Sequence, residues 1–515
     1  MVLRTRAAIA AGSPTSVAAG AQVAEAGGNV VDIAVATALA ATVSELLMCS
    51  LGGSGFIMLR PGPGQSPELI DGYDAMPGLD RPVGKPVHNG RRVHLAYGDG
   101  VDVIAGHGSI AVPGLLAGLE TAWRRHGSLP WAEVIAPASK VAREGCPMSQ
   151  PGARWLVVAG DGIFGHQAAS RETFYPKDDR VIREGERLLI PHLGDTMDAI
   201  SREGARVFYE GDLAAMFSSE MAEHGGLVTR DDLANYRARV REPLFLDSGG
   251  FRVALNPPPA VGGAAVGSLI ALVQHGWVHA GSEAERIALL ARAQTQLITL
   301  RERTLLQPNL ARETAEGLME PDYLRQHLGK LSSPHTTHLS VATADGGLAA
   351  ITMSMGYGSG ITIPGTGIAC NNSLGEPELN PHGFHAGKPG TRLVSNMAPT
   401  VAFHPDGRAM ALGSPGASRI TTAIAQAWCR ASLGGLSPAE AVAFPRIHVE
   451  QWGEELRLQC EPMIATAKVE QDYRIRPFED LDMFFGAVQI AARSTDGSLV
   501  AAADSRRAGC TRLID

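Results

Sequence analysis

The character of the sequence changes near residue 335, and this change constrains the fold more than any other feature. Before it, long alanine-rich or amphipathic stretches such as residues 30–47 predict helices. After it, short apolar runs flank Asp-Gly pairs, and each such pair predicts a β-hairpin. The pairs lie at residues 345–346, 406–407 and 496–497. Helices followed by hairpins favour an α+β chain built in layers, with an αββα arrangement as the expectation.

The net charge of the chain and the length of its apolar runs argue against two kinds of partner, nucleic acids and membranes. The 515 residues include 45 Lys and Arg against 53 Asp and Glu, a net charge of −8, which predicts no nucleic-acid partner. The longest weakly polar run, residues 33–44, is far shorter than the ~20 residues that span a bilayer, so we expect no membrane segment. The six cysteines form no C-x-x-C pair, and residues 1–12 lack a signal-peptide core. A cytoplasmic location is therefore expected.

The sequence contains few motifs that indicate a metal site or a nucleotide site. The sixteen histidines are dispersed, and H-E-x-x-H, G-x-S-x-G and P-loop motifs are missing, so we expect no metal and no organic cofactor. Residues 160–165 do match G-x-G-x-x-G after the apolar run 156–159. A dinucleotide site would need a helix directly after this glycine segment, and Pro176 leaves little room for one. We interpret the segment as a turn; the alternative, a nucleotide site, predicts NAD(P) affinity.

The segment with the most chemical content begins at Thr336. A polar stretch, residues 305–335, ends there and a strand starts with Thr336-Thr-His338. A threonine hydroxyl is a weak nucleophile without a base beside it. Cleavage before Thr336 would place a new α-amino group, which titrates near pH ~8, next to that hydroxyl. On spacing alone, however, two threonines at a strand start are also ordinary β-propensity.

Several separated blocks share one pattern. Residues 25–34 read E-A-G-G-N-V-V-D-I-A, residues 52–56 G-G-S-G-F, residues 336–338 T-T-H, residues 413–419 G-S-P-G-A-S-R and residues 504–509 D-S-R-R-A-G. In this order, the blocks resemble those of the γ-glutamyltransferases (γ-glutamyltranspeptidases), a family of N-terminal-nucleophile hydrolases. The resemblance runs from residue 8 to residue 509 and so covers nearly the whole chain.

The resemblance implies a four-layer αββα sandwich made by self-cleavage of one precursor. Cleavage would fall between His335 and Thr336 and give a large subunit, residues 1–335, and a small subunit, residues 336–515. The two fragments would remain together as a heterodimer.

The resemblance also implies catalytic roles. Thr336 would be both the processing residue and the nucleophile, and Ser354 stands where the family has a second threonine that hydrogen-bonds the nucleophile. Gly416 and Ala417 occupy the positions of two glycines whose backbone N–H groups form the oxyanion hole. Water or an amine would then resolve an acyl-enzyme.

The substrate-binding positions depart from the family pattern. Tyr73 stands where the family has an arginine that grips the glutamate α-carboxylate, and loss of a bidentate cation is not a conservative change. Glu376 is what remains of an acidic pair, Ser395-Asn396 replaces a Ser-Ser pair, and Gly356 replaces an asparagine. These departures predict an acyl-cleaving enzyme whose small-molecule substrate differs from a γ-glutamyl compound.

Three functional alternatives stay open at this point. The chain could be a γ-glutamyl enzyme, or a paralogue that acts on an oxamate-type amide, a β-lactam side chain, or a C–C bond in 4-alkylproline antibiotic biosynthesis. It could also be a non-catalytic homologue that is not processed. Retention of Thr336, Ser354 and the Gly416 turn favours catalysis.

Overall fold

A computed structural model describes residues 4–80, 89–96, 100–176, 179–300, 311–319, 336–380 and 383–515. His335, the first half of the expected cleavage site, lies outside these ranges. Thr336 and all the other expected site residues lie within them.

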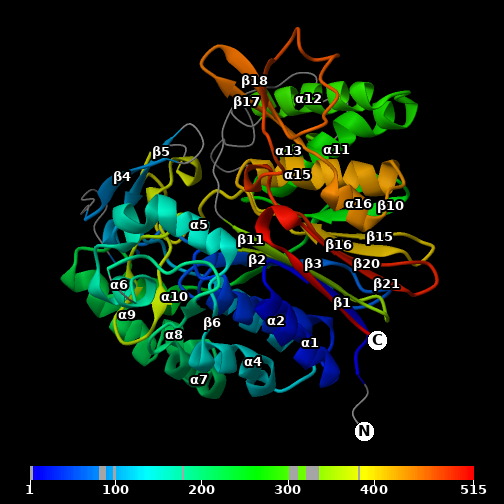
Figure 1. Ribbon diagram of the computed structural model, residues 1–515. Helices are drawn as coiled ribbons and strands as arrows, with labels where there is room; N and C mark the ends of the chain where they lie inside the picture. The colour runs from blue at the N-terminus through cyan, green and yellow to red at the C-terminus, as the bar shows by residue number, and fades with distance from the viewer. Residues whose placement is uncertain are drawn as a thin grey trace.

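Two antiparallel sheets form the centre of the molecule (Figure 1). The larger sheet has the order β22 (Cys510–Ile514), β1 (Ala7–Ala11), β11 (Thr337–Thr343), β12 (Leu348–Ser354), β2 (Ser54–Arg60), β3 (Glu68–Gly72) and β8 (Arg239–Arg241). The smaller has the order β21 (Leu499–Ala503), β20 (Gln489–Arg493), β16 (Ala409–Gly413), β15 (Thr400–Phe403), β10 (Phe251–Leu255) and β9 (Leu244–Ser248). Strands from both sides of residue 335 are therefore interleaved in the larger sheet.

The three expected hairpins are confirmed. The Asp-Gly pairs connect β11 with β12, β15 with β16, and β20 with β21, and each pair of strands is antiparallel. Two of these hairpins lie in the smaller sheet and one lies in the larger, so the hairpin-rich segment after residue 335 contributes to both.

Helices cover the outer faces of both sheets. Figure 1 shows α1 (Pro14–Glu25), α2 (Val30–Ser44) and α4 (Trp131–Glu144) on one side, with α11 (Gly262–His279), α12 (Glu283–Leu300) and α15 (Arg419–Trp428) on the other. Separate apolar cores fill the space between each helix group and its sheet. A third core, which includes Phe56, Met58 and Val401, joins residues of the two sheets.

The remaining elements lie around this centre. The helices are α3 (Leu115–His126), α5 (Gln150–Ala159), α6 (Ala168–Phe174), α7 (Leu193–Glu203), α8 (Arg206–Tyr209), α9 (Asp212–Glu223), α10 (Arg230–Asn235), α13 (Arg312–Gly317) and α16 (Pro438–Ala443). The short strands are β4 (Arg91–Leu95), β5 (Val101–Ala105), β6 (Cys146–Pro147), β7 (Arg187–Leu188), β13 (Thr362–Ile363), β14 (Ile368–Ala369), β17 (Ile447–Trp452), β18 (Glu455–Cys460) and β19 (Arg474–Pro477).

The glycine segment 160–165 does not have the geometry of a nucleotide site. The apolar residues before it belong to α5, and Gly160–Phe164 continues that helix as one π-helical turn. A dinucleotide site needs a strand before the glycines and a helix opening after them. The nucleotide alternative is therefore wrong, because the apolar run is helical.

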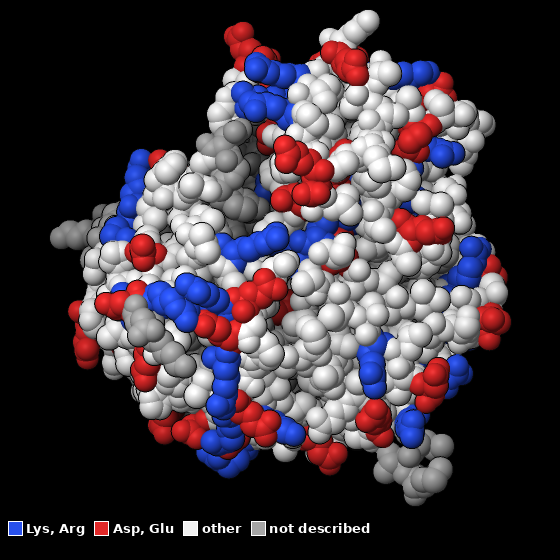
Figure 2. Space-filling view, viewed as in Figure 1, with Lys and Arg blue, Asp and Glu red and all other residues white. Residues whose placement is uncertain are grey.

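Three further properties concern the surface charges, the hydropathy of the helices and the state of the cysteines. The face drawn in Figure 2 carries acidic and basic side chains interspersed. Within the described ranges, no helix is long and apolar enough to cross a membrane. All six cysteines are described, and each is a free thiol.

Candidate active site

Thr336 lies at one end of the larger sheet, directly before β11, and is only 4% exposed. In the pairing of β11 with β12, Thr337 is opposite Met353. Extending this antiparallel register by one residue places Thr336 opposite Ser354, the last residue of β12. Ser354 is in turn paired with Ser54 of β2. The structure therefore brings Thr336 and Ser354 onto adjacent strand ends.

Distant parts of the chain hold the start of β11 in place. The Arg507 guanidinium donates to the Thr336 carbonyl at 3.3 Å, and the Thr337 hydroxyl donates to Glu45 Oε2 at 2.5 Å. On β12, the Ser354 hydroxyl accepts a hydrogen bond from the Gly356 N–H at 2.8 Å. Segments near residues 45, 354 and 507 thus fix the backbone around Thr336.

Two buried ionisable side chains next to Thr336 have shifted pKa values. Burial raises the pKa of Glu45 to about 7, despite hydrogen bonds from Thr337 and Ser16 that favour its charged form. Burial lowers the pKa of His338 to about 3, so its imidazole is neutral at physiological pH. The His338 ring contacts the hydroxyls of Thr352 and Ser340 at 2.8 and 3.0 Å. The contact with Thr352 connects β11 with β12.

The expected oxyanion-hole residues lie in the loop between β16 and α15. A Cβ on Gly413, the last residue of β16, would lie 2.3 Å from His338 Cε1, so this loop begins beside the end of β11 that carries Thr336. Gly416 and Ala417 follow with φ angles of +119° and +65°. Neither N–H donates a hydrogen bond to any described residue. Two adjacent N–H groups without a partner among the described residues, in the loop just before α15, are suited to a developing negative charge.

Tyr73 and Ser395, both expected to bind substrate, lie together. The Tyr73 ring is buried and stacks on Phe56 with centroids 5.0 Å apart. Burial raises the pKa of Tyr73 well above its usual value, and the negative charges of Asp74 and Glu376 raise it further. The Ser395 hydroxyl lies near this phenol and partly offsets the rise in its pKa. The phenol is therefore a neutral donor in acidic surroundings.

Asn396 lies next to this pair and is also buried. The Ser395 carbonyl accepts the N–H of Val261 at 2.8 Å, and its hydroxyl accepts the N–H of Met397 at 3.2 Å. Gly262 packs against the Asn396 carbonyl, where a Cβ would lie only 2.1 Å away. The Ser395-Asn396 segment is thus anchored on the start of α11.

Asp74 and Glu376 give the surroundings of Tyr73 their acidic character. Asp74 Oδ2 accepts the hydroxyls of Ser54 at 2.8 Å and Ser373 at 2.6 Å. Burial raises the pKa of Asp74 to about 7. Glu376 is buried beside Gly356, where a Cβ would lie 1.9 Å from Glu376 Oε1. Gly356 has a φ of +64°, so both conformation and space explain why glycine replaces the family's asparagine.

The described cations near Tyr73 already have a carboxylate partner. Asp71 is completely buried and forms ion pairs with Arg392 at 3.0 Å and Arg241 at 2.7 Å. Arg392 also stacks over the Tyr236 ring. Such a buried arginine is held by its own ion pair and is costly to detach for a substrate carboxylate.

Several of these residues could not be identified from the sequence. Glu45 and Arg392 carry no motif of their own and meet the site only through the fold, whereas Asp74 directly follows the expected site residue Tyr73. Arg507 belongs to the block at residues 504–509, so its place in a matching motif was a signal, although its contact with Thr336 was not foreseeable.

A separate group could hold a metal. One ligand atom each from His107, Glu220 and His224 lie within 4.8 Å of one another. The expectation of no metal rested on histidines that are dispersed in sequence, whereas the fold brings two of them to one carboxylate.

Comparisons with known proteins point in one direction. The family model described as gamma-glutamyltranspeptidase matches residues 16–513. A glutathione hydrolase proenzyme of Escherichia coli is 27% identical, covering 97% of this chain and 90% of its own. An acylase ACY 1 proenzyme of a Pseudomonas species is 29% identical, covering 98% and 93%. The crystal structure of a cephalosporin acylase from Bacillus halodurans superposes with a TM-score of 0.82, at 26% identity, covering 99% and 96%.

Proposed function

Because the chain belongs to the gamma-glutamyltranspeptidase family, we propose that it is a self-processing threonine hydrolase or acyltransferase that cleaves an amide through an acyl-enzyme on Thr336. Members of this family and the related acylases are enzymes that act on amide bonds, and this chain is an enzyme of the same kind. The observation that supports the proposal is the register of β11 and β12, which sets Thr336 opposite Ser354 at adjacent strand ends, while the loop that carries Gly416 and Ala417 begins at Gly413 beside His338.

Processing would break the peptide bond between His335 and Thr336. It yields residues 1–335 and 336–515, which remain together as a heterodimer. Two of the relatives named above are called proenzymes, which agrees with a precursor that is cut. The resulting arrangement is an αββα sandwich in four layers. The six free thiols support a cytoplasmic location.

The reaction then follows from the groups present. The new α-amino group of Thr336 takes the proton of its own hydroxyl as Oγ1 attacks the amide carbon. The N–H groups of Gly416 and Ala417 stabilise the oxyanion of the tetrahedral intermediate. The amine leaves with the proton, and an ester on Thr336 remains. Water attacks this ester to release a carboxylic acid, or an amine attacks it to form a new amide.

We propose that the acyl group differs from γ-glutamyl in lacking a carboxylate at the end that lies near Tyr73. A γ-glutamyl donor has an α-carboxylate that needs a cation, and the two described arginines at Asp71, two residues before Tyr73, are already paired with the Asp71 carboxylate. The negative charges of Asp74 and Glu376, which raise the pKa of Tyr73, would also repel the α-carboxylate of such a substrate. We therefore propose an acyl group that is uncharged or carries a donor at this end, such as the side chain of a β-lactam or another non-glutamyl amide. The name of the B. halodurans relative agrees with this direction.

The class of enzyme is tested by the intact mass and N-terminal sequence of the purified protein beside Thr336→Ala. We expect two fragments, the smaller of which begins Thr336-Thr-His338, and a single uncut chain in the variant. Thr336→Ser should still be processed, because it keeps the hydroxyl. A wild-type chain that stays whole would remove the processing proposal and leave the non-catalytic alternative.

The substrate is tested with p-nitroanilides that share a leaving group and differ in the acyl part. We expect the processed enzyme to hydrolyse a neutral acyl anilide with a larger kcat/KM than the γ-glutamyl anilide. Tyr73→Arg should raise kcat/KM for the γ-glutamyl substrate alone. Preference of the wild type for γ-glutamyl anilide would contradict the substrate proposal without affecting the enzyme class.

A further inference from the structure

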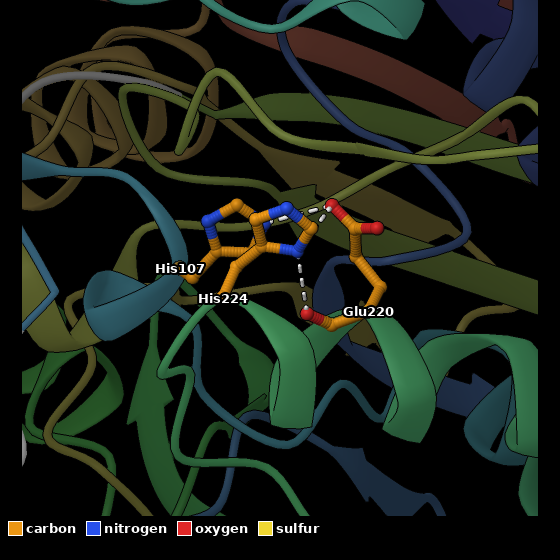
Figure 3. A group of neighbouring side chains, drawn as sticks. All are labelled: His107, Glu220 and His224. Atoms are coloured by element: carbon orange, nitrogen blue, oxygen red, sulfur yellow. Dashed lines mark hydrogen bonds and ion pairs between the residues drawn. The ribbon is translucent and has the colours of Figure 1, made fainter.

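His107, Glu220 and His224 lie together outside the proposed active site (Figure 3). His107 begins a 3-10 turn, His107–Ser109, after β5, whereas Glu220 is in the last turn of α9 and His224 ends that helix. His107 Nε2 lies 2.8 Å from Glu220 Oε1, and His224 Nδ1 lies 3.6 Å from the same oxygen. We propose that these three side chains bind a divalent transition-metal ion such as Zn²⁺.

The carboxylate at the centre of the group is held rigidly. The side chains of His107 and Glu220 are only 11% and 9% exposed. Gln167 donates to Glu220 Oε1 at 3.0 Å, and its own amide is fixed to both the N–H and the carbonyl of Thr362. A neighbour that orients a ligand in this way is typical of metal sites in proteins.

The chemistry of the three groups suits zinc. Two imidazoles and one carboxylate are the protein ligands of many zinc sites, which leave a fourth position open.

Binding requires small movements. With metal–ligand distances near 2.0–2.2 Å, ligand atoms around a tetrahedral zinc lie about 3.3 Å apart. The 2.8 Å contact between His107 and Glu220 must therefore lengthen by roughly half an ångström. The His224 ring is stacked on His107 at 4.7 Å, and its Nδ1 lies 3.1 Å from the Glu220 main-chain carbonyl, so the ring must turn away from both to point this nitrogen at the same ion. It is 49% exposed, so it has room to turn.

The group opens into a pocket of about 770 Å³. His166, His192 and Glu172 also line this pocket. Four of the chain's sixteen histidines therefore face one space. The open metal position faces this pocket and can be filled by water.

The test is a titration of the EDTA-treated full-length protein with Zn²⁺ alone, followed by calorimetry. We expect one ion per chain in the wild type. His107→Ala and His224→Gln should each weaken binding by more than the about 10–100-fold that changes around the ligands cost. With Co²⁺ in place of Zn²⁺, the wild type should show the visible absorption of a four-coordinate ion, and both variants should lose it.

The control is His94→Ala. His94 also contacts a carboxylate, that of Asp102 at 2.8 Å, but its side chain is 69% exposed and it lies outside the three-ligand group. We expect this variant to bind Zn²⁺ as the wild type does. His224 lies at the surface, so His224→Gln should fold even if a change at His107 does not. The proposal is overturned if the wild type binds Zn²⁺ no more tightly than His224→Gln, or if His94→Ala loses as much.

Discussion

Gly416 and Ala417 both have positive φ angles, but only Ala417 carries a side chain there. A left-handed backbone costs a non-glycine residue about 1–2 kcal/mol, and a glycine loses about 0.5–1 kcal/mol of chain entropy instead. We therefore expect Ala417→Gly to change the free energy of unfolding by no more than about 1 kcal/mol. Processing and kcat should stay within a few-fold of the wild type, because both N–H donors remain. Urea denaturation and an activity assay measure this.

The neighbouring substitution should behave in the opposite way. A Cβ on Gly416 would lie 2.9 Å from the Gly486 Cα, at a φ of +119°. Gly416→Ala must therefore move the loop that carries the two donors, and we expect a loss of at least about tenfold in kcat. Equal effects at both positions would contradict the assignment of the donors.

Glu45 predicts a specific pH dependence of stability. Its pKa is about 7 in the folded chain against 4.5 ordinarily, so between these values the folded state binds one more proton than the unfolded state. Stability should fall as pH rises from about 4.5 to 7 and level off above that, with a contribution of up to about 3 kcal/mol. Glu45→Gln should remove this contribution and flatten the profile.

The measurement is urea unfolding of Glu45→Gln at pH 5 and pH 8, in a Thr336→Ala background that keeps the chain uncut. Glu133→Gln, at an exposed position on α4, is the matched control and should keep the wild-type slope. If Glu45→Gln keeps that slope too, the carboxyl is not protonated in the folded chain.

The site residues differ in how far the sequence could identify them. Thr336, Ser354, Gly416 and Ala417 follow from the order of blocks along the chain, and their roles stay predictions. Glu45 could not be found in this way, because an acidic residue that ends a helix has no distinguishing pattern. Its contact with Thr337 spans 292 positions and exists only after the sheet has formed.

At the scale of elements, α2 shows why the block at residues 25–34 is needed. The helix is buried on every side, so it depends on its end for polar contacts. Asn29 and Asp32 form a capping box, and Asp32 also accepts the N–H groups of Ser128 and Leu129 and the Ser128 hydroxyl. A motif that looks like a helix start thus also joins α2 to the segment between α3 and α4.

These contacts predict that substitutions at Asn29 and Asp32 lower the free energy of unfolding by different amounts. Asn29→Ala removes a cap and should lower the free energy of unfolding by about 1 kcal/mol. Asp32→Ala leaves several partly buried donors without an acceptor and should cost more, about 2–3 kcal/mol. Urea denaturation in the Thr336→Ala background distinguishes them, and a larger effect at Asn29 would show that the cap alone is important.

Elements differ in how well sequence patterns predict them. The Asp-Gly hairpins were predictable because two residues set both the turn and the register of short strands. The run at 156–159 before the glycines was harder to interpret, since four apolar residues fit a strand or a buried helix equally well. The length of the surrounding helix, Gln150–Ala159, decides between these alternatives, and it depends on packing.

At the scale of the whole molecule, the two expected fragments are interleaved. In the larger sheet, β22, β11 and β12 come from residues after 335, whereas β1, β2, β3 and β8 come from residues before it. The smaller sheet also contains strands from both fragments. Separation of the fragments would break main-chain ladders in both sheets and expose the core between them.

We therefore expect the processed protein to run as one species in native size-exclusion chromatography, even at high dilution, while denaturing gels show two bands. Separation should require the same urea concentration as loss of circular dichroism. Release of either fragment in native buffer would contradict the interleaved arrangement.

The layers could be expected from the sequence, but the strand order could not. Local patterns indicated helices before residue 335 and hairpins after it, and the resemblance supplied the sandwich. The insertion of β11 and β12 between β1 and β2 depends on contacts nearly 300 positions apart, such as Ile57 opposite Ile351. No local pattern encodes which distant strands become neighbours.

The pairing of β1 with β22 makes a circular permutation of the chain possible. Ala7 lies opposite Ile514, so the two termini meet at the same edge of the molecule (Figure 1). A short Gly-Ser linker could join them, and the gene could then be opened between residues 335 and 336. Such a circular permutant would expose Thr336 by removal of the initiator methionine, with no self-cleavage. Catalysis by the threonine could then be studied apart from the step that normally creates it.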